Sequence, residues 1–270
     1  MRSDDVLVSI VSISLNCEKT IQRTINSLLG QTYKNIELIH IDGKSEDSTM
    51  RIINKFKKKF AKIVTEKDGG IFDAYNKGIA VAKGDLIGII NGDDYYDLNA
   101  VDEVVKAYKK YGDSFFYFGN QLLFNSRGEV YGRRVVNTNS LFFMRSGSSI
   151  PHPTVFITKK IYDQVGLFNT QYRIAADYDF LYRLVKVSKV NFKYLNKNIA
   201  FFGSGGVSSN IPKAARECHL IRLSYGFSFF ESYMYFLKSI VFYLTRRILY
   251  LLGLKSVVNL YRKKIIKTHD

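Results

Sequence analysis

Residues Leu86–Tyr96 read LIGIINGDDYY, an apolar run followed by a turn and two acids. The run Leu86–Ile90 predicts a strand buried on both faces, and Asn91-Gly92 predicts the turn that ends it. Asp93 and Asp94 follow, with no Lys or Arg within several residues to pair them. Adjacent carboxylates at the end of a buried strand repel each other, and a cation between them would relieve that cost.

Two interpretations of this pair of acids are open. Mg²⁺ takes oxygen ligands, usually one or two carboxylates together with substrate phosphates. In open α/β sheets ligands bind beyond the carboxyl ends of the strands, which is where Asp93 and Asp94 fall. The pair would then form a metal-diphosphate site. The alternative is a solvated turn before a helix that Asp97 caps.

Composition and cysteine usage indicate an ordinary globular chain. Its 270 residues, 46% of them hydrophobic, suit one large domain or one domain with an appendage. Cys17 and Cys218 are far apart without CxxC spacing, which argues against a zinc site or a disulfide framework and fits a reducing compartment. Two acids precede the first apolar run, where a signal peptide has a basic start. We therefore expect a cytoplasmic protein.

The first 112 residues alternate between strand and helix patterns. Runs rich in Val and Ile predict strands at 6–15, 36–41, 62–65 and 86–90. Apolar residues at helical spacing predict helices at 18–29, 50–60, 71–82 and 97–111. Four strand–helix units with short links predict a doubly wound, Rossmann-like, mostly parallel α/β sheet. Such a half-chain commonly holds a nucleotide at its strand ends.

The second half loses this alternation. Short strands, some of them antiparallel, are predicted at 115–118, 122–124, 130–134, 154–158, 191–194 and 199–202. Helices are predicted at 159–165 and 175–187. Everything after residue 210 has a helical pattern, so we expect a C-terminal helical extension.

The extension, residues 211–270, is basic and amphipathic. An apolar stripe at helical spacing runs through 237–252. Lys238, Arg246 and Arg247 interrupt it, so no uncharged stretch reaches the ~18–20 residues that a spanning helix needs. Eleven Lys or Arg stand against three Asp or Glu, which gives the extension +8 of the net +16. This predicts helices on an anionic membrane surface. The alternative is a helical pair packed on the core or on a second copy, as in a homo-oligomer.

Several stretches resemble, in order, the family-2 glycosyltransferases of the GT-A fold that build bacterial surface polysaccharides. The matching stretches are VSIVS at 8–12, IDGKSEDST at 41–49, DGGIFDAYNKGIA at 68–80, NGDD at 91–94, HPT at 152–154 and ADYD at 176–179. The ordered series is more specific than any one motif. It implies a catalytic domain over 1–210, with a nucleotide-sugar half at 1–112 and a small antiparallel acceptor half at 113–210.

The resemblance gives the acids of the first half roles in donor binding. Asp42 would accept a hydrogen bond from the nucleotide base, Asp68 would line the nucleoside or donor-sugar site, and Asn76 would help hold the donor. Their alternatives are a helix cap, a turn residue and a packed polar residue, respectively. Asp93 would reach the ribose or the metal, and Asp94 would ligate Mg²⁺ or Mn²⁺ across the diphosphate.

Asp177 is the candidate general base. An inverting transfer is a single displacement that needs one carboxylate to take the acceptor's proton and one cation to hold the diphosphate. Relatives carry Glu-Asp where this chain has Ala176-Asp177, so Asp177 is the matching base. Asp179 points elsewhere on the helix and is interpreted as a solvent-facing or helix N-terminal acid. His152 would lie near the diphosphate or the metal, although a lone His is more often structural.

Two further positions qualify the resemblance. Asn91 stands where many relatives have a further Asp, which weakens a metal role for that position. Arg173 and the loop 203–209 could close over phosphate or acceptor, or be a plain surface Arg and a plain loop.

The resemblance implies a metal-dependent hexosyl- or N-acetylhexosaminyltransferase. It would take a nucleotide sugar, by preference a UDP-sugar, and a glycan or polyprenyl-linked acceptor on the inner face of the cell membrane. A nucleotidyltransferase is a rival, but its usual glycine-rich basic loop is absent after the first strand. A nucleic-acid-binding protein is disfavoured because the predicted ligand side is acidic. A scaffold with a dead transferase core is disfavoured because all the key acids are present.

Overall fold

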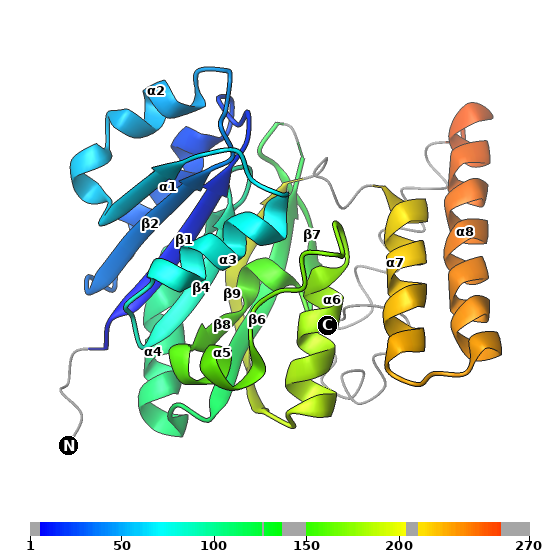
Figure 1. Ribbon diagram of the computed structural model, residues 1–270. Helices are drawn as coiled ribbons and strands as arrows, with labels where there is room; N and C mark the ends of the chain where they lie inside the picture. The colour runs from blue at the N-terminus through cyan, green and yellow to red at the C-terminus, as the bar shows by residue number, and fades with distance from the viewer. Residues whose placement is uncertain (1–5, 126, 137–149, 204–209, 255–270) are drawn as a thin grey trace.

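A sheet of nine strands forms the centre of the protein, and helices cover both of its faces (Figure 1). The computed structural model describes residues 6–125, 127–136, 150–203 and 210–254. Within these ranges the strand order is β3-β2-β1-β4-β8-β6-β9-β5, with β7 paired to β6. β4, the strand that carries the two acids at its end, lies between the parallel half and the mixed half of the sheet.

The N-terminal half confirms the predicted alternation. Its strands are β1 (Val8–Ser14), β2 (Ile36–Asp42), β3 (Lys62–Thr65) and β4 (Leu86–Asn91), all mutually parallel. Its helices are α1 (Ile21–Leu29), α2 (Thr49–Asn54), α3 (Ile71–Val81) and α4 (Ala100–Tyr111). The helix predicted over 50–60 is shorter, because α2 ends at Asn54 and a separate 3-10 turn follows at Lys57–Lys59. No residue of that lysine turn is buried, so packing against the core does not favour a longer α2.

The second half is less regular and corrects two predictions. Its elements are β5 (Tyr95–Tyr96), β6 (Phe115–Phe124), β7 (Val130–Arg134), β8 (Phe156–Thr158), β9 (Asn191–Gly203), α5 (Lys159–Val165) and α6 (Ala176–Tyr182), which continues as a π-helical turn over Arg183–Val187. The strands predicted at 115–118 and 122–124 are one strand, and so are those at 191–194 and 199–202. Register shifts around Asn120 accommodate the polar residues between the apolar runs.

Strand direction also differs from the prediction in one place. β6 and β9 pair in parallel, whereas β8 is antiparallel to both β4 and β6. β7 and β5 pair antiparallel to β6 and β9. The small antiparallel region that the sequence predicted is therefore present but is built around one long parallel pair.

Each face of the sheet has its own core. Ile10 and Val11 are adjacent on β1 and point to opposite faces, as the strand period requires. Val11 packs with Tyr75 of α3 and Phe180 of α6, while Ile10 belongs to the cluster that contains Val104 of α4. Figure 1 shows α3 and α5 in front of the strands.

The C-terminal extension is a pair of antiparallel helices, α7 (Ile211–Ser224) and α8 (Phe229–Leu251) (Figure 1). Ile221 of α7 is fully buried and belongs to the same core cluster as α3 and α6. α8 buries only Ser232 and lies on the far side of α7 from the sheet. The boundary expected at residue 210 is thus a change in sequence pattern, and the core continues across it into α7. None of the described helices is both long and apolar enough to cross a membrane.

Close contact between α3 and β1 predicts the effect of Gly78→Ala. A Cβ atom at Gly78 would lie 2.1 Å from Cγ1 of Val11, so the helix or the strand must shift. Overpacking of this kind costs about 1–3 kcal/mol of unfolding free energy, measured by chemical denaturation. Ala80→Ser, at an exposed position on the same helix, is the control and should stay within about 0.5 kcal/mol. A Gly78→Ala protein as stable as the wild type would contradict this packing.

Candidate active site

Helix α1 fixes the turn that follows β4. Within the turn, the Asp94 amide donates to the carbonyl of Asn91 over 3.1 Å. The Thr24 hydroxyl lies 3.1 Å and 2.6 Å from the carbonyl oxygens of Gly92 and Asp94. Arg23 donates to the carbonyl of Asp93 over 3.2 Å. The backbone under the two acids is therefore held from a helix about 70 residues earlier in the chain.

The two acids differ in their surroundings. Asp94 is fully buried; its Oδ1 accepts from the Gly203 amide over 2.9 Å and its Oδ2 from the Asn91 side chain over 3.2 Å. Burial and the charge of Asp93 raise the pKa of Asp94 well above its usual value. Asp93 is half-buried, and burial raises its pKa as well.

No Lys or Arg is close to these acids in sequence, but Arg23 of α1 lies close to them in space. The charge of Arg23 lowers the pKa of both Asp93 and Asp94, though less than burial raises them. Its guanidinium lies 4.2 Å from the ring centroid of Phe124 and 4.9 Å from that of Tyr95. Arg23 and the two acids are about 70 residues apart in the chain, and Arg23 does not share the helix face of the buried Ile21, Ile25 and Leu28, so the sequence pattern did not indicate this contact.

Tyr75 of α3 connects the two acids with the distant candidate base. Its hydroxyl donates to Asn91 Oδ1 over 2.7 Å. Burial raises the pKa of Tyr75 well above its usual value, and the charges of Asp94, Asp177 and Asp93 raise it further. The charges of carboxylates from two remote parts of the chain thus both act on the Tyr75 phenol. Asp94 and Asp177 therefore both lie near Tyr75 of α3.

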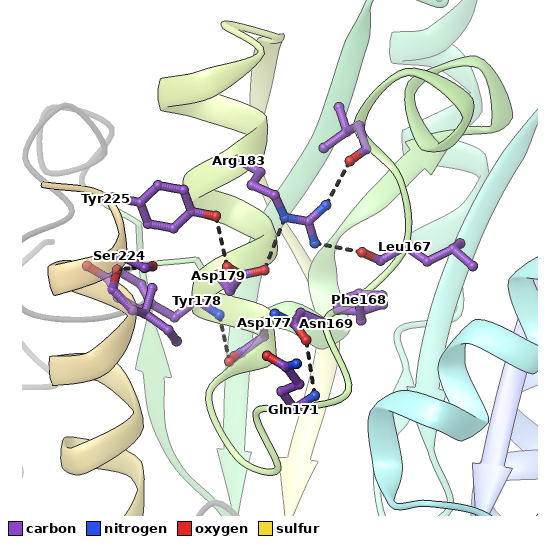
Figure 2. Close-up of polar contacts among 12 residues, drawn as sticks. Leu167, Phe168, Asn169, Gln171, Asp177, Tyr178, Asp179, Arg183, Ser224 and Tyr225 are labelled. Atoms are coloured by element: carbon purple, nitrogen blue, oxygen red, sulfur yellow. Dashed lines mark hydrogen bonds and ion pairs between the residues drawn. The ribbon is translucent and has the colours of Figure 1, made fainter.

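Asp177 lies in the first turn of α6 and is half-buried. Its Oδ1 accepts from the Tyr178 amide over 2.8 Å, as Figure 2 shows. Burial raises the pKa of Asp177 to about 6. The charge of Asp177 in turn raises the pKa of Cys218 on α7. A carboxylate with this pKa is mostly ionised at pH 7 and is more basic than an ordinary Asp, which suits proton abstraction.

Asp179 is buried, so it is not solvent-facing, but it lies in the first turn of α6, as the alternative of a helix N-terminal acid predicted. It forms an ion pair with Arg183 at 3.0 Å and accepts from the Tyr225 hydroxyl over 2.8 Å (Figure 2). Arg183 also donates to the carbonyls of Val165 and Leu167 over 2.7 Å and 2.6 Å. Asp179 therefore ties α6, α7 and the loop after α5 together.

Two predicted donor-binding residues have structural contacts of their own. Asn76 pairs its whole amide with the backbone of Phe168, donating over 2.9 Å and accepting over 3.0 Å. His152 begins the 3-10 turn His152–Thr154 and stacks on Tyr75 with ring centroids 5.1 Å apart. Burial lowers the pKa of His152 to about 4, so its ring is neutral at pH 7. Among the described residues, its buried Nδ1 has no hydrogen-bond partner.

Asp42 and Asp68 lie side by side beyond β2 and β3. Asp42 is fully buried and accepts from Ser14 over 2.9 Å and from the amide and hydroxyl of Ser45 over 2.8 Å and 2.6 Å. Asp68 accepts from the Gly70 amide over 2.9 Å. Its Oδ2 lies 2.6 Å from where a Cβ would stand on Gly43, so a larger residue at 43 would displace the Asp68 carboxylate.

Cys17, which the sequence interpretation did not use, lies between these acids and the turn after β4. Burial raises the pKa of its thiol, and the charges of Asp93, Asp47 and Asp42 add to this. Its Sγ is 3.1 Å from the position of a Cβ on Gly92. The acids that follow β2 and β4 therefore share one edge of the sheet, its carboxyl edge.

Asp93 and Asp94 are suitable ligands for a divalent cation whose remaining ligands would come from a bound substrate. Among the described residues there is no group of three or more His, Cys, Asp and Glu side chains that could hold a metal ion. Asp93 and Asp94 nevertheless offer adjacent carboxylates whose pKa values are raised by burial. Mg²⁺ commonly binds one or two carboxylates together with substrate phosphates, and Mn²⁺ also favours oxygen ligands.

Fold and site together define a GT-A enzyme of the nucleotide-sugar class. Residues 9–167 match the model of glycosyl transferase family 2, and the chain belongs to that family. Asp177 lies just beyond the matched range. Membership of this family confirms the resemblance inferred from the ordered motifs.

Relatives and solved structures agree with this assignment. A PGL/p-HBAD biosynthesis glycosyltransferase of Mycobacterium bovis is 26% identical over 210 residues, which are 76% of this chain and 80% of that protein. A chondroitin synthase of Pasteurella multocida is 31% identical over 71% of this chain but only 20% of its own length. The fold is similar to that of S. aureus TarS 1-349 in complex with UDP-GlcNAc, with a TM-score of 0.64, 16% identity, and coverage of 87% of this chain and 71% of that one.

The crowding of negative charge after β4 predicts that Asp93→Asn stabilises the metal-free protein. Removing this charge relieves Asp94, so the unfolding free energy at pH 7 should rise by about 0.5–2 kcal/mol. The same variant should lose the rise in Tm that MnCl₂ gives the wild type with UDP. Asp163→Asn, at an exposed acid of α5, is the control. An unchanged response of Asp93→Asn to Mn²⁺ would remove Asp93 from the cation site.

Proposed function

We propose that the protein is an inverting glycosyltransferase that moves a sugar from a UDP-sugar to a hydroxyl of a glycan or polyprenyl-linked acceptor. The observation that carries this proposal is the grouping of Asp93, Asp94 and Asp177 around Tyr75. Asp93 and Asp94 suit the diphosphate side of the reaction, where a cation is needed. Asp177 suits the acceptor side, where a base is needed. Similarity to a PGL/p-HBAD biosynthesis glycosyltransferase and to a chondroitin synthase supports cell-surface polysaccharide biosynthesis as the setting.

The donor would lie along the carboxyl edge of the sheet. Asp42 and Asp68 would take the nucleoside, since they stand together beyond β2 and β3. UDP is favoured because a neighbour of the same fold binds UDP-GlcNAc. Asp94, with Asp93, would hold Mg²⁺ or Mn²⁺, which when bound supplies positive charge to the departing diphosphate. Asn76 and His152 would shape this side of the site, Asn76 through Phe168 and His152 through its stack on Tyr75.

Asp177 would accept the proton of the acceptor hydroxyl as that oxygen attacks the anomeric carbon. Its pKa of about 6 keeps it largely ionised at pH 7 and strengthens it as a base. The bond from the anomeric carbon to the UDP oxygen breaks in the same displacement, which inverts the configuration. A nucleotidyltransferase is no longer favoured, because the chain belongs to a glycosyltransferase family.

Asp177→Asn is expected to lower the turnover number for UDP-GlcNAc by at least about 100-fold, because general base catalysis contributes about 10²–10⁴. UDP affinity, measured by calorimetry, should change less than twofold. In the wild type, turnover should fall as the pH drops through about 6, because protonated Asp177 cannot accept a proton. Asp163→Asn is the control for loss of an acid. A fully active Asp177→Asn enzyme would remove the base assignment.

We also propose that α8 rests on an anionic membrane surface. α8 turns its buried Ser232 toward α7, where Ser232 lies 2.6 Å from His219. Large apolar side chains cover much of the remaining surface. Those at least half exposed are Phe229 at 65%, Phe230 at 75%, Met234 at 50%, Val241 at 59%, Ile248 at 55% and Leu251 at 80%.

This distribution is the reverse of a helix in a soluble bundle, whose apolar side faces the protein. Lys238 and Arg247 are exposed on the same helix, and the extension carries +8. Positive charge beside an apolar stripe favours a membrane with anionic lipid over a second copy of the same basic surface, because two such surfaces repel each other. A membrane position would bring the site beside a lipid-linked acceptor on the inner face of the cell membrane.

The double variant Val241→Glu/Ile248→Glu is expected to bind phosphatidylglycerol vesicles at least about tenfold more weakly in sedimentation assays. Each buried aliphatic side chain contributes ~1.5 kcal/mol or more. Leu98→Glu/Val130→Glu, at exposed apolar positions of the catalytic domain, is the matched control and should bind like the wild type. Unchanged binding by the α8 variant would refute the assignment. So would a lipid-independent dimer that the variant dissociates, since that would assign the face to a second copy.

A further inference from the structure

One buried carboxylate on α7 holds the segment that leads into α6. Glu217 Oε1 accepts from the Arg173 amide over 3.0 Å. Its Oε2 accepts from the amides of Ile174 and Ala175 over 2.8 Å and 2.9 Å. Glu217 is 8% exposed, so solvent hardly competes for these bonds. Three successive backbone donors thus meet one side chain, which comes from about 42 residues further along the chain.

Glu217 supplies side-chain acceptors just before α6, whose N-cap residue makes no side-chain hydrogen bond of its own. The residue before α6 is Ala175, which has no side chain that can accept from the first free amides of the helix. Asp177 itself is bonded to the Tyr178 amide. Among the described residues, Glu217 is the side chain that accepts from the amides of residues 173–175.

α7 is firmly placed to act as this support. Ile221 of α7 is fully buried in the core cluster that contains α3 and α6. One helical turn further on, Tyr225 donates to Asp179 and stacks on Tyr182, with ring centroids 4.3 Å apart. α7 thus contacts α6 both at its beginning and along its body. Glu217 and Tyr225 lie outside the family-matched residues 9–167, so family membership assigns no role to either.

We propose that Glu217 is a positioning residue for the transfer reaction: its three hydrogen bonds fix the turn that carries Asp177 and so set where the base meets the acceptor hydroxyl. The inference rests on the proposed role of Asp177. Glu217 contacts neither donor nor acceptor in this account. It acts on the reaction through the backbone of residues 173–175, and it makes α7 part of the catalytic unit.

The charge of Glu217 supports the same role. Burial is the main cause of the raised pKa of Asp177, and the local amide hydrogen bonds lower that pKa. The charge of Glu217 raises it further. Among the described residues, Glu217 and Cys218 of α7 and Tyr75 of α3 interact electrostatically with Asp177. Since Tyr75 and Cys218 have raised pKa values, they are neutral at pH 7, and Glu217 is the acid among these three neighbours.

Glu217→Gln tests the proposal, because it keeps the side-chain shape and removes one of the two strong acceptors. Hydrogen exchange of the amides of residues 173–175 should become about 10- to 100-fold faster, as expected when bonds to a charged group are weakened. Turnover of UDP-GlcNAc to UDP should fall at least about tenfold, while UDP affinity from calorimetry stays within twofold. If Glu217 acted on stability alone, Glu217→Gln would lower Tm without lowering turnover at unchanged UDP affinity.

Tyr225→Phe is the matched control, because it removes a different hydrogen bond between α6 and α7. It should lower Tm while leaving exchange at residues 173–175 and turnover within about twofold of the wild type. If hydrogen exchange at residues 173–175 is unchanged in Glu217→Gln, the proposal is overturned, whatever the turnover of the variant. Faster exchange with wild-type turnover would also overturn it, provided that Asp177→Asn is inactive. An active Asp177→Asn protein would instead overturn the base assignment, and the exchange result would still report on the support that Glu217 gives.

Discussion

Two adjacent carboxylates at the end of a buried strand are the constraint on which the rest of this structure depends. Burial and mutual repulsion raise the pKa of Asp94, and burial raises that of Asp93. Side chains of α1 donate hydrogen bonds to the backbone carbonyls of both acids, and the Gly203 amide at the end of β9 donates to the Asp94 carboxylate. Such an arrangement costs stability in the free protein, which is typical of a site that awaits a cation and a phosphate.

The sheet order explains how distant residues meet at this point. β4 lies between the parallel strands β1–β3, of which β2 ends at Asp42, and the mixed strands that lead to α6. Tyr75 bridges the halves, because its ring stacks on His152 and its hydroxyl donates to Asn91. α7 then closes the arrangement from outside, through Glu217 and Ile221. The C-terminal extension is therefore two different elements: α7 supports the site, and α8 offers an exposed apolar surface.

Sequence reasoning captured what short-range patterns encode. Apolar runs and helical spacing predicted every strand and helix of the parallel half, with α2 shorter than expected, and the ordered motifs predicted the family and the acids at the strand ends. It did not predict features that depend on long-range contacts, such as Arg23 beside Asp93 or Glu217 beside residues 173–175. It also divided β6, because Asn120 is polar, yet this residue is fully buried and bonds to Asn196 across the sheet. Asp179 was misjudged for the same reason, since its partners come from other segments.

The most direct measurement of the central claim is the anomalous scattering of Mn²⁺ in crystals grown with UDP. The account predicts one strong peak at the turn after β4, within coordination distance of Asp94 or Asp93 and of the diphosphate oxygens, with Asp177 on the same side of the sheet. UDP bound elsewhere on the protein, or an ion peak remote from both acids, would contradict it.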